Sequence, residues 1–371
     1  MNASEASELA RRAPFVRPAP GTRFRILCID GGGIRGVIPA RVLRHLESLL
    51  EARGDSAPLA ERFQLLAGTS TGGLIALGLS GRGASGAPLL NAAELVELYE
   101  GEDGREIFRR PLIRRLPLLR RLIDLVLPKY SLGPLRRVLE RRYGEALLGD
   151  ALSEVMVTAY DMTERRPTFF KRWQPDAAAR PIVDAALATA AAPTFFPPHE
   201  LEGRALVDGG LFAANPTVAA IVEALKRTAA PAALEPNDLL VVSLGTGHHE
   251  IRFEPAATRR WGAADWALPG RGGDPPLIAA MLDGQSDAAD HWAHVLLNHE
   301  PGEPMAHGAA IGVGPRYYRF QVDLPRGLPL DDPSPGNIGL LAECGDALIE
   351  ARAAELEALA GELARSPGDS G

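Results

Sequence analysis

The stretch Phe24-Arg25-Ile26-Leu27-Cys28-Ile29 is followed directly by Asp30-Gly31-Gly32-Gly33-Ile34-Arg35-Gly36. The first part is a short apolar run that favours a buried strand, and the glycines end it. From Val37 to Glu51 apolar residues recur at helical spacing, which predicts a helix directly after the glycine turn. A glycine-rich turn between a strand and a helix lets backbone N–H groups approach an anion closely. This part of the chain therefore predicts an α/β unit with an anion-binding turn.

The same alternation of apolar runs and helical patterns continues along the chain. Strands are also predicted at residues 63–67, 155–160 and 239–244. A helix of small residues is predicted from Leu74 to Leu79, and the segment 80–130 is mostly helical and punctuated by proline. Residues 338–363 form one long amphipathic pattern, which we expect to be interrupted near Gly345. We expect an α/β fold with a mainly parallel central sheet flanked by helices, and a ligand at the carboxyl ends of its strands.

Composition and charge exclude several classes of protein. The 371 residues include 40 Lys and Arg against 47 Asp and Glu, and the net charge of −7 argues against a general nucleic-acid binder. Two cysteines, Cys28 and Cys344, exclude a disulfide scaffold and a cysteine-rich metal site, and we expect no metal and no cofactor. Residues 1–23 lack the apolar core of a signal peptide and are expected to form a loose N-terminal arm. No uninterrupted apolar run is long enough to span a membrane, so we expect a cytoplasmic protein.

The motif Gly31–Gly36 fits the G-x-G-x-x-G pattern of dinucleotide-binding turns. A dinucleotide site also needs an acidic residue at the end of the second strand, where it binds the ribose. Here the second predicted strand ends in Ala67-Gly68-Thr69-Ser70, which contains no carboxylate. The turn can instead bind the transient oxyanion of an acyl-transfer reaction. A nucleotide-binding module remains the alternative from a different functional class.

A second glycine motif, Gly68-Thr69-Ser70-Thr71-Gly72, has the G-x-S-x-G pattern of a nucleophilic serine on a sharp strand-to-helix turn. The alternative is that Ser70 only caps the helix that follows. A nucleophilic serine needs a base. His199 lies near other motifs, but Asp208 is better placed, because Gly209 and Gly210 leave its carboxylate open to a shared reaction site. By itself, the Asp-Gly pair favours an ordinary turn.

Taken in order, these motifs resemble those of the patatin-like phospholipase family, and we expect a bacterial-type member. The resemblance also includes Lys129-Tyr130-Ser131, the stretch Ala190–His199 and Asn215-Pro216, and it extends from about Arg25 to Gly247. It implies a patatin-like catalytic domain over residues 24–247, with a three-layer sandwich related to the α/β-hydrolases. Residues 248–371 are then expected to form a C-terminal helical extension packed on the same unit.

The resemblance implies a Ser–Asp dyad without histidine, in which Ser70 is the nucleophile and Asp208 the base. The backbone N–H groups of Gly31, Gly32 and Gly33 would form the oxyanion hole, and Arg35 would support that loop or the charge. Five further glycines complete the motifs: Gly36, Gly68, Gly72, Gly209 and Gly210. Burial between Val207 and Leu211 is expected to raise the pKa of Asp208 and make its carboxylate a better base at neutral pH.

The activity implied is calcium-independent hydrolysis of acyl esters in phospholipids or lysophospholipids, through an acyl-enzyme intermediate. An acyltransferase or a general carboxylesterase on the same dyad is the alternative among enzymes, since all three share the first half-reaction. Some bacterial relatives are effectors activated by a cyclic nucleotide, and the C-terminal third would be the natural place for such a site.

One segment differs in charge from the rest of the chain. Residues 109–129 carry seven basic side chains and one acidic one, a local charge of +6 that leaves −13 for the remainder. Paired arginines separated by apolar residues suit an interfacial segment, with Arg114, Arg115, Arg120 and Arg121 as candidates for membrane docking. The alternative is a surface helix whose arginines pair with acidic neighbours. The sequence leaves both open, and peripheral contact with a membrane along this segment is one of the two expectations.

Overall fold

The computed structural model describes residue 15 and residues 22–109, 127–227, 233–249, 253–268, 275–298, 316–325 and 328–364. A sheet of eight strands runs through its centre. Its strands are β1 (Phe24–Ile29), β2 (Leu65–Gly68), β3 (Glu154–Asp161), β4 (Arg166–Lys171), β5 (His199–Leu201), β6 (Arg204–Asp208), β7 (Leu239–Leu244) and β9 (Tyr317–Phe320). A separate pair is made by β8 (His248–His249) and β10 (Asp323–Leu324).

The strand order is β5-β6-β3-β2-β1-β7-β9, with β4 paired to β3. Strands β3, β2, β1, β7 and β9 run parallel to one another, whereas β4, β5 and β6 pair in antiparallel fashion at one edge. In the middle of the sheet Cys28 lies between Ala67 on β2 and Ser243 on β7. The predicted α/β class with a mainly parallel central sheet is confirmed, and so are the strands predicted around β1, β2, β3 and β7.

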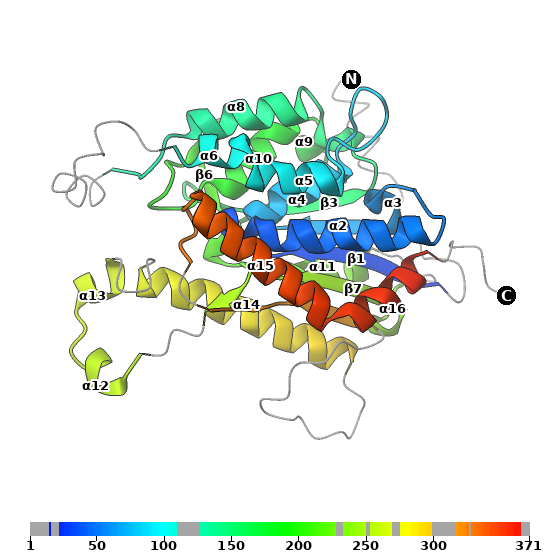
Figure 1. Cartoon of the computed structure of the whole chain (residues 1–371). Helices are drawn as coiled ribbons and strands as arrows, with labels where there is room; N and C mark the ends of the chain where they lie inside the picture. Colours follow the sequence, from blue (N-terminus) through cyan, green and yellow to red (C-terminus); the bar gives the residue numbers. More distant parts are fainter. Residues whose placement is uncertain are drawn as a thin grey trace.

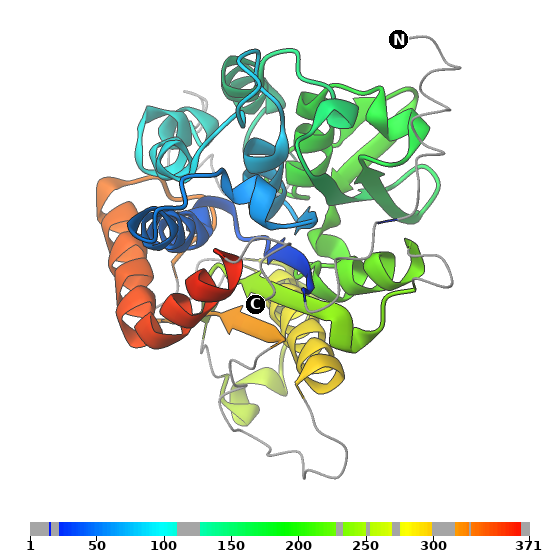
Figure 2. The same cartoon turned by 90° about the vertical axis from the view of Figure 1, so that its right-hand side faces the viewer.

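Helices lie on both faces of this sheet (Figures 1 and 2). The helices are α2 (Val37–Ala52), α3 (Leu59–Arg62), α4 (Thr71–Ser80), α5 (Ala92–Glu100), α6 (Glu102–Ile107), α8 (Leu132–Tyr143), α9 (Pro175–Ala178), α10 (Ile182–Ala190), α11 (Thr217–Arg227), α12 (Pro255–Thr258), α13 (Ala263–Ala267), α14 (Pro276–Leu297), α15 (Pro335–Ala351) and α16 (Ala353–Leu363). Short 3-10 turns include η1 (Gly33–Gly36) and η4 (Gly209–Leu211).

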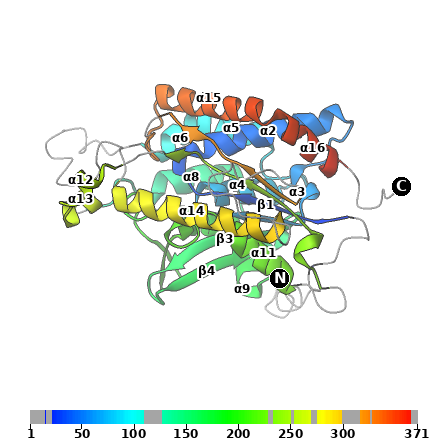
Figure 3. The same cartoon turned by 90° about the horizontal axis from the view of Figure 1, so that it is seen from below.

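The alternation of side chains along β1 explains the layers. Leu27 and Ile29 belong to the core shared with α2, α4, α5, α10, α15 and α16. Ile26 and Cys28 point to the other face, into a core shared with α11 and α14. Because β1 is buried on both faces, its sequence is apolar apart from Arg25. Figure 3, seen from below, shows α14 and α11 on the side of the sheet opposite to α2 and α15.

The C-terminal helical segment corrects one prediction. The chain does not break near Gly345, which lies inside α15; the break falls at Arg352, between α15 and α16. A Cβ atom at Gly345 would lie 3.3 Å from the Arg41 side chain and 3.7 Å from the Cα atom of Ile38, both on α2. This glycine therefore allows two helices to pack closely, and it does not end one.

Residues beyond 247 add a strand to the sheet as well as helices, because β9 pairs in parallel with β7. Phe15, within the segment expected to be a loose arm, packs against Phe24 and Trp173, with ring centroids 5.5 and 5.0 Å away. The domain boundaries at 23 and 247 stay predictions. None of the helices in the described ranges is both long enough and apolar enough to span a bilayer.

Candidate active site

Ser70 lies at the turn between the carboxyl end of β2 and the start of α4. Its backbone has φ 53° and ψ −122°, a conformation that non-glycine residues rarely adopt. Its N–H group donates a hydrogen bond of 2.9 Å to Oγ1 of Thr189. A Cβ atom at Gly68 would lie 2.1 Å from the carbonyl oxygen of Gly72, so the turn leaves no space for a side chain there. The Ser70 hydroxyl makes no capping hydrogen bond to α4, which excludes the helix-cap alternative.

Asp208 ends β6 and faces this serine. Its Oδ1 accepts a hydrogen bond of 2.7 Å from the Gly210 N–H group, and Asp208 and Ser70 line the same cavity. Gly209 is required beside it, because a Cβ atom there would lie 2.0 Å from Oγ1 of Thr158 on β3. Burial raises the pKa of Asp208 to about 6, although the nearby Ser70 hydroxyl and the hydrogen bond from Gly210 act in the opposite direction. A carboxylate with this pKa is ionised at neutral pH and can accept a proton.

The glycine loop before η1 forms another wall of the site. The Gly31 N–H group already donates to the Ala214 carbonyl at 2.9 Å, so its predicted part in an oxyanion hole is corrected. The N–H groups of Gly32 and Gly33 have no hydrogen-bond acceptor among the described residues. Gly33 has φ +57°, and a Cβ atom there would lie 2.2 Å from the Leu330 carbonyl oxygen. Two N–H groups of this loop are thus available to an anion.

Arg35 does not reach into the cavity beside Ser70. Its Nε and Nη2 atoms donate to the Leu328 carbonyl at 3.0 and 2.5 Å, and the side chain is buried. These contacts support the glycine loop. Arg35 was expected to support either this loop or the charge of the oxyanion. At Gly36 a Cβ atom would lie 2.5 Å from both Thr71 and Tyr99, so this glycine allows the loop to pack against α4 and α5.

An apolar cavity opens beside Ser70 and Asp208. Its walls come from α6 and the residue after it, α8, the loop after α10, and the first turns of α14. The side chains that make it apolar include Ile107, Phe108, Leu135, Phe195, Phe196, Ile278, Met281 and Leu282. The wall from α14 was not predicted from the sequence. The sequence signal for this wall is that Met281 and Leu282 follow Ile278 by three and four residues, so that the three apolar side chains share one face of a helix.

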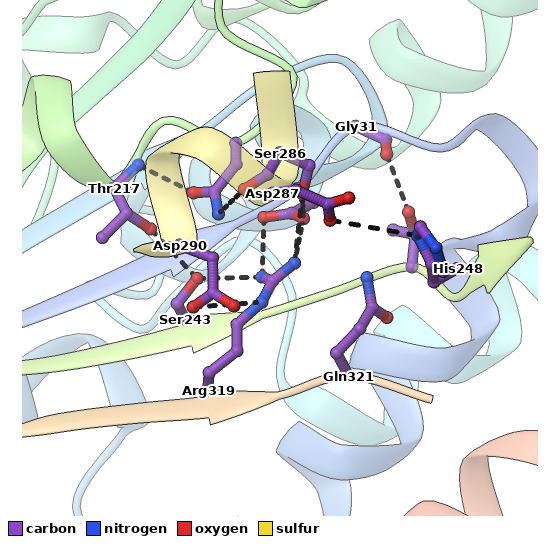
Figure 4. Close-up of polar contacts among 12 residues, drawn as sticks. Gly31, Thr217, Ser243, His248, Ser286, Asp287, Asp290, Arg319 and Gln321 are labelled. Carbon is purple, nitrogen blue, oxygen red and sulfur yellow. Dashed lines mark hydrogen bonds and ion pairs between the residues drawn. The ribbon is translucent and has the colours of Figure 1, made fainter. Parts of the chain in front are cut away.

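A buried polar network lies on the other side of the glycine loop (Figure 4). Arg319 on β9 binds both carboxylate oxygens of Asp30 and also donates to the hydroxyl of Ser243 on β7, at 2.9 Å. Ser286 of α14 donates to the Asp30 carboxylate at 2.9 Å. The Thr246 hydroxyl binds the Gly31 carbonyl at 2.7 Å. Side chains from β9 and α14 and the residue Thr246 after β7 therefore fix the glycine loop through hydrogen bonds to Asp30 and Gly31.

The remaining predicted residues lie elsewhere. Arg114, Arg115, Arg120 and Arg121 fall outside the described residues. Lys129, at the end of that basic segment, pairs with Asp331 at 3.2 Å, and its ammonium lies 4.3 Å from the centre of the Phe195 ring. His199 lies on β5 with Nε2 3.3 Å from Asp184 and does not line the cavity.

The sequence model of the patatin-like phospholipase family matches residues 27–221. Patatin-like protein 2 of Arabidopsis thaliana is 32% identical over 91% of this chain and 86% of its own length. Patatin-17 of Solanum cardiophyllum is 30% identical over 89% of this chain and 84% of its own length. Among solved structures, VipD from Legionella pneumophila is similar with a TM-score of 0.38 and 12% identity, over 90% of this chain and 68% of that one. The two relatives compared by sequence are plant proteins, and the expectation of a bacterial-type chain stays a prediction.

Proposed function

Because the chain belongs to the patatin-like phospholipase family, we propose that it is a lipid acyl hydrolase of the phospholipase A or lysophospholipase type. The proposal rests above all on one observation: Ser70 and the buried Asp208 carboxylate lie together in the wall of one apolar cavity. The polar pair supplies a nucleophile and its base, and the cavity suits the acyl chain of a lipid.

In the first half-reaction, Oγ of Ser70 attacks the ester carbonyl carbon while its proton passes to the Asp208 carboxylate. The carbonyl oxygen becomes an oxyanion, which the N–H groups of Gly32 and Gly33 stabilise. The ester C–O bond then breaks, and the protonated Asp208 gives its proton to the departing alcohol oxygen. The acyl group remains on Ser70 as an ester.

In the second half-reaction a water molecule attacks the acyl carbon and gives a proton to Asp208. The bond between the acyl carbon and Ser70 Oγ breaks, the proton returns to Oγ, and a free fatty acid leaves. An alcohol in place of water would give acyl transfer, so the products decide between the hydrolase and the acyltransferase.

The experiment is product analysis after incubation with a phospholipid that carries two different acyl chains. We expect one free fatty acid and the matching lysophospholipid, unchanged by a calcium chelator. Ser70→Ala and Asp208→Asn should abolish the products, whereas Ser48→Ala, at a serine whose hydroxyl donates to the His45 carbonyl of its own helix, should not. Turnover by purified Ser70→Ala would overturn the assignment of the nucleophile.

Peripheral membrane contact along residues 109–129 and a cytoplasmic location also remain proposals, as does an activating cyclic nucleotide. Glutamine at Arg114, Arg115, Arg120 and Arg121 should weaken binding to anionic vesicles without changing hydrolysis of a soluble ester. Unchanged vesicle binding would contradict the docking role of that segment.

A further inference from the structure

Three large aromatic side chains gather around the two short helices α12 and α13. The ring of Trp261 lies edge-on to those of Phe253 and Trp266, with centroids 4.8 and 5.1 Å apart. We call Phe253, Trp261 and Trp266 the aromatic cluster. Phe253 and Trp266 are 47% and 41% exposed, although side chains of this size are mostly buried in soluble proteins. A group of exposed rings marks a surface that meets a partner.

The aromatic cluster lies beside α14, the helix whose first turns line the cavity. Helix α13 packs against α14, and Figures 1 and 3 both show α12 and α13 beyond the first turn of α14, on the outside of the molecule. The first turns of α14 carry Leu277, 46% exposed, and Met281, 39% exposed. Met281 also lines the apolar cavity, together with Ile278 and Leu282. Exposed apolar side chains therefore continue from the aromatic cluster to the cavity that contains Ser70.

The chemistry of this surface suits a lipid layer. Tryptophan is enriched where proteins meet the boundary between lipid headgroups and acyl chains, because its ring is apolar and its N–H group is polar. Arg259 and Arg260 lie beside Trp261, are exposed, and form no ion pair with the described residues, so their charges are available to lipid phosphates. A surface for a protein partner would not need to continue into a cavity of this kind.

We propose that the aromatic cluster and the first turns of α14 insert into the headgroup layer of a lipid aggregate and dock the cavity entrance onto it. The proposal rests on the proposed function, because it assigns a lipid as the occupant of the cavity. Docking allows an acyl chain to pass from the aggregate into the cavity without crossing water, and this avoids the cost of hydrating the chain.

The test uses a Ser70→Ala background, in which the lipid is not consumed. Binding is measured by co-sedimentation with vesicles of phosphatidylcholine and of phosphatidylcholine mixed with phosphatidylglycerol. We expect Trp261→Ala with Trp266→Ala to weaken binding about tenfold or more, as expected when two interfacial rings are lost. Trp292→Ala is the matched control, since this ring is 60% exposed on α14 but lies eleven positions beyond Met281, and we expect unchanged binding.

Two further measurements test the same docking surface if the variant with both Trp261→Ala and Trp266→Ala folds poorly. Leu277→Glu changes the same surface on a long helix without touching the cavity lining, and it should also weaken vesicle binding. In a Trp292→Phe background, vesicles of brominated lipid should quench the emission of Trp261 and Trp266, while Trp173 stays shielded in the core.

Unchanged vesicle binding in the double variant and in Leu277→Glu would overturn the proposal. A change in oligomeric mass with unchanged vesicle binding would assign the surface to a second copy of the chain and would also overturn it. Hydrolysis of a soluble short-chain ester by the chain with Ser70 intact tests the proposed function separately. If that activity is missing while vesicle binding still depends on the aromatic cluster, the result contradicts the proposed hydrolase function. The proposal of a docking surface would still stand.

Discussion

The guanidinium of Arg319 binds both oxygens of the Asp30 carboxylate, with N–O distances of 3.0 and 2.7 Å. Both side chains are buried. Burial by itself lowers the pKa of Arg319, but the facing Asp30 carboxylate outweighs it and the pKa is raised. Asp30 directly precedes the glycine loop, and Arg319 lies on β9, far along the chain. A strand beyond residue 247 therefore fixes the residue next to the proposed oxyanion hole.

Removal of one partner from this buried pair should be costly. Arg319→Met leaves the Asp30 carboxylate without its cation, and we expect the free energy of unfolding to fall by about 3–5 kcal/mol. Urea denaturation of the purified variant measures this. Arg136→Met is the matched control, because Arg136 is 41% exposed and pairs with Glu140 at 3.9 Å, an ion pair worth at most about 0.5 kcal/mol. Equal unfolding midpoints for Arg319→Met and the unchanged chain would contradict this account of the network.

The rate of ester hydrolysis should depend on the ionisation of Asp208. The base is active as a carboxylate, and its pKa is about 6 in the folded chain. We therefore expect kcat/KM for a soluble ester to be constant at neutral pH and to fall about tenfold per pH unit well below pH 6. Initial rates across this range measure the profile. A rate that stays constant down to the ordinary pKa of an aspartate would contradict the raised pKa of Asp208.

Replacement of the same carboxylate should stabilise the fold while it abolishes turnover. The pKa of Asp208 is raised from 3.8 to about 6 on folding, so the folded state favours the protonated form and loses stability as pH rises between these two values. The Asp208→Asn variant carries an uncharged amide there at every pH, and the amide oxygen can still accept the Gly210 hydrogen bond. At pH 8 the variant should be more stable by on the order of 2 kcal/mol, and the difference should shrink towards pH 4. Thermal or urea unfolding at both pH values checks this, and a less stable variant at pH 8 would contradict it.

Substitution of alanine for glycine should abolish most activity at Gly32 but leave activity unchanged at Gly284. A Cβ atom at Gly32 would lie 2.3 Å from Oγ1 of Thr246, so Gly32→Ala must displace either the loop or the end of β7. We expect at least about a hundredfold loss of kcat, as when an oxyanion donor is removed. Gly284 lies inside α14, where an added methyl group would have no neighbouring atom within 4 Å, and Gly284→Ala should raise stability by up to about 1 kcal/mol without loss of activity. Similar activities of the two variants would show that the Gly32 position is not critical.

Most of the central sheet could be predicted because its strands are buried on both faces. The runs at β1, β2, β3 and β7 are mostly apolar stretches bounded by glycine or polar residues, which is a strong local signal. The turns at Gly31–Gly36 and Gly68–Gly72 could be located for the same local reason. The G-x-S-x-G turn predicted Ser70 as a nucleophile. Its pairing with Asp208 followed from family resemblance, since no spacing along a chain tells which two turns meet in space.

The C-terminal part could not be predicted in the same way. Strand β9 is only four residues long and contains Arg319, so a local pattern gives little reason to place it in the core. Its arginine is buried because Asp30, close to 300 positions earlier, neutralises it. The break at Arg352 was likewise missed, because Gly345 is explained by packing against α2 and not by helix termination.

In the proposed mechanism, Ser70 forms an acyl-enzyme and Asp208 is its base. The most direct measurement is labelling with a fluorophosphonate, followed by mass spectrometry of the peptides. We predict one phosphonate per chain, attached to Ser70, with labelling that is much slower in Asp208→Asn and absent in Ser70→Ala. A phosphonate on another residue, or undiminished labelling of the Ser70→Ala variant, would contradict the account.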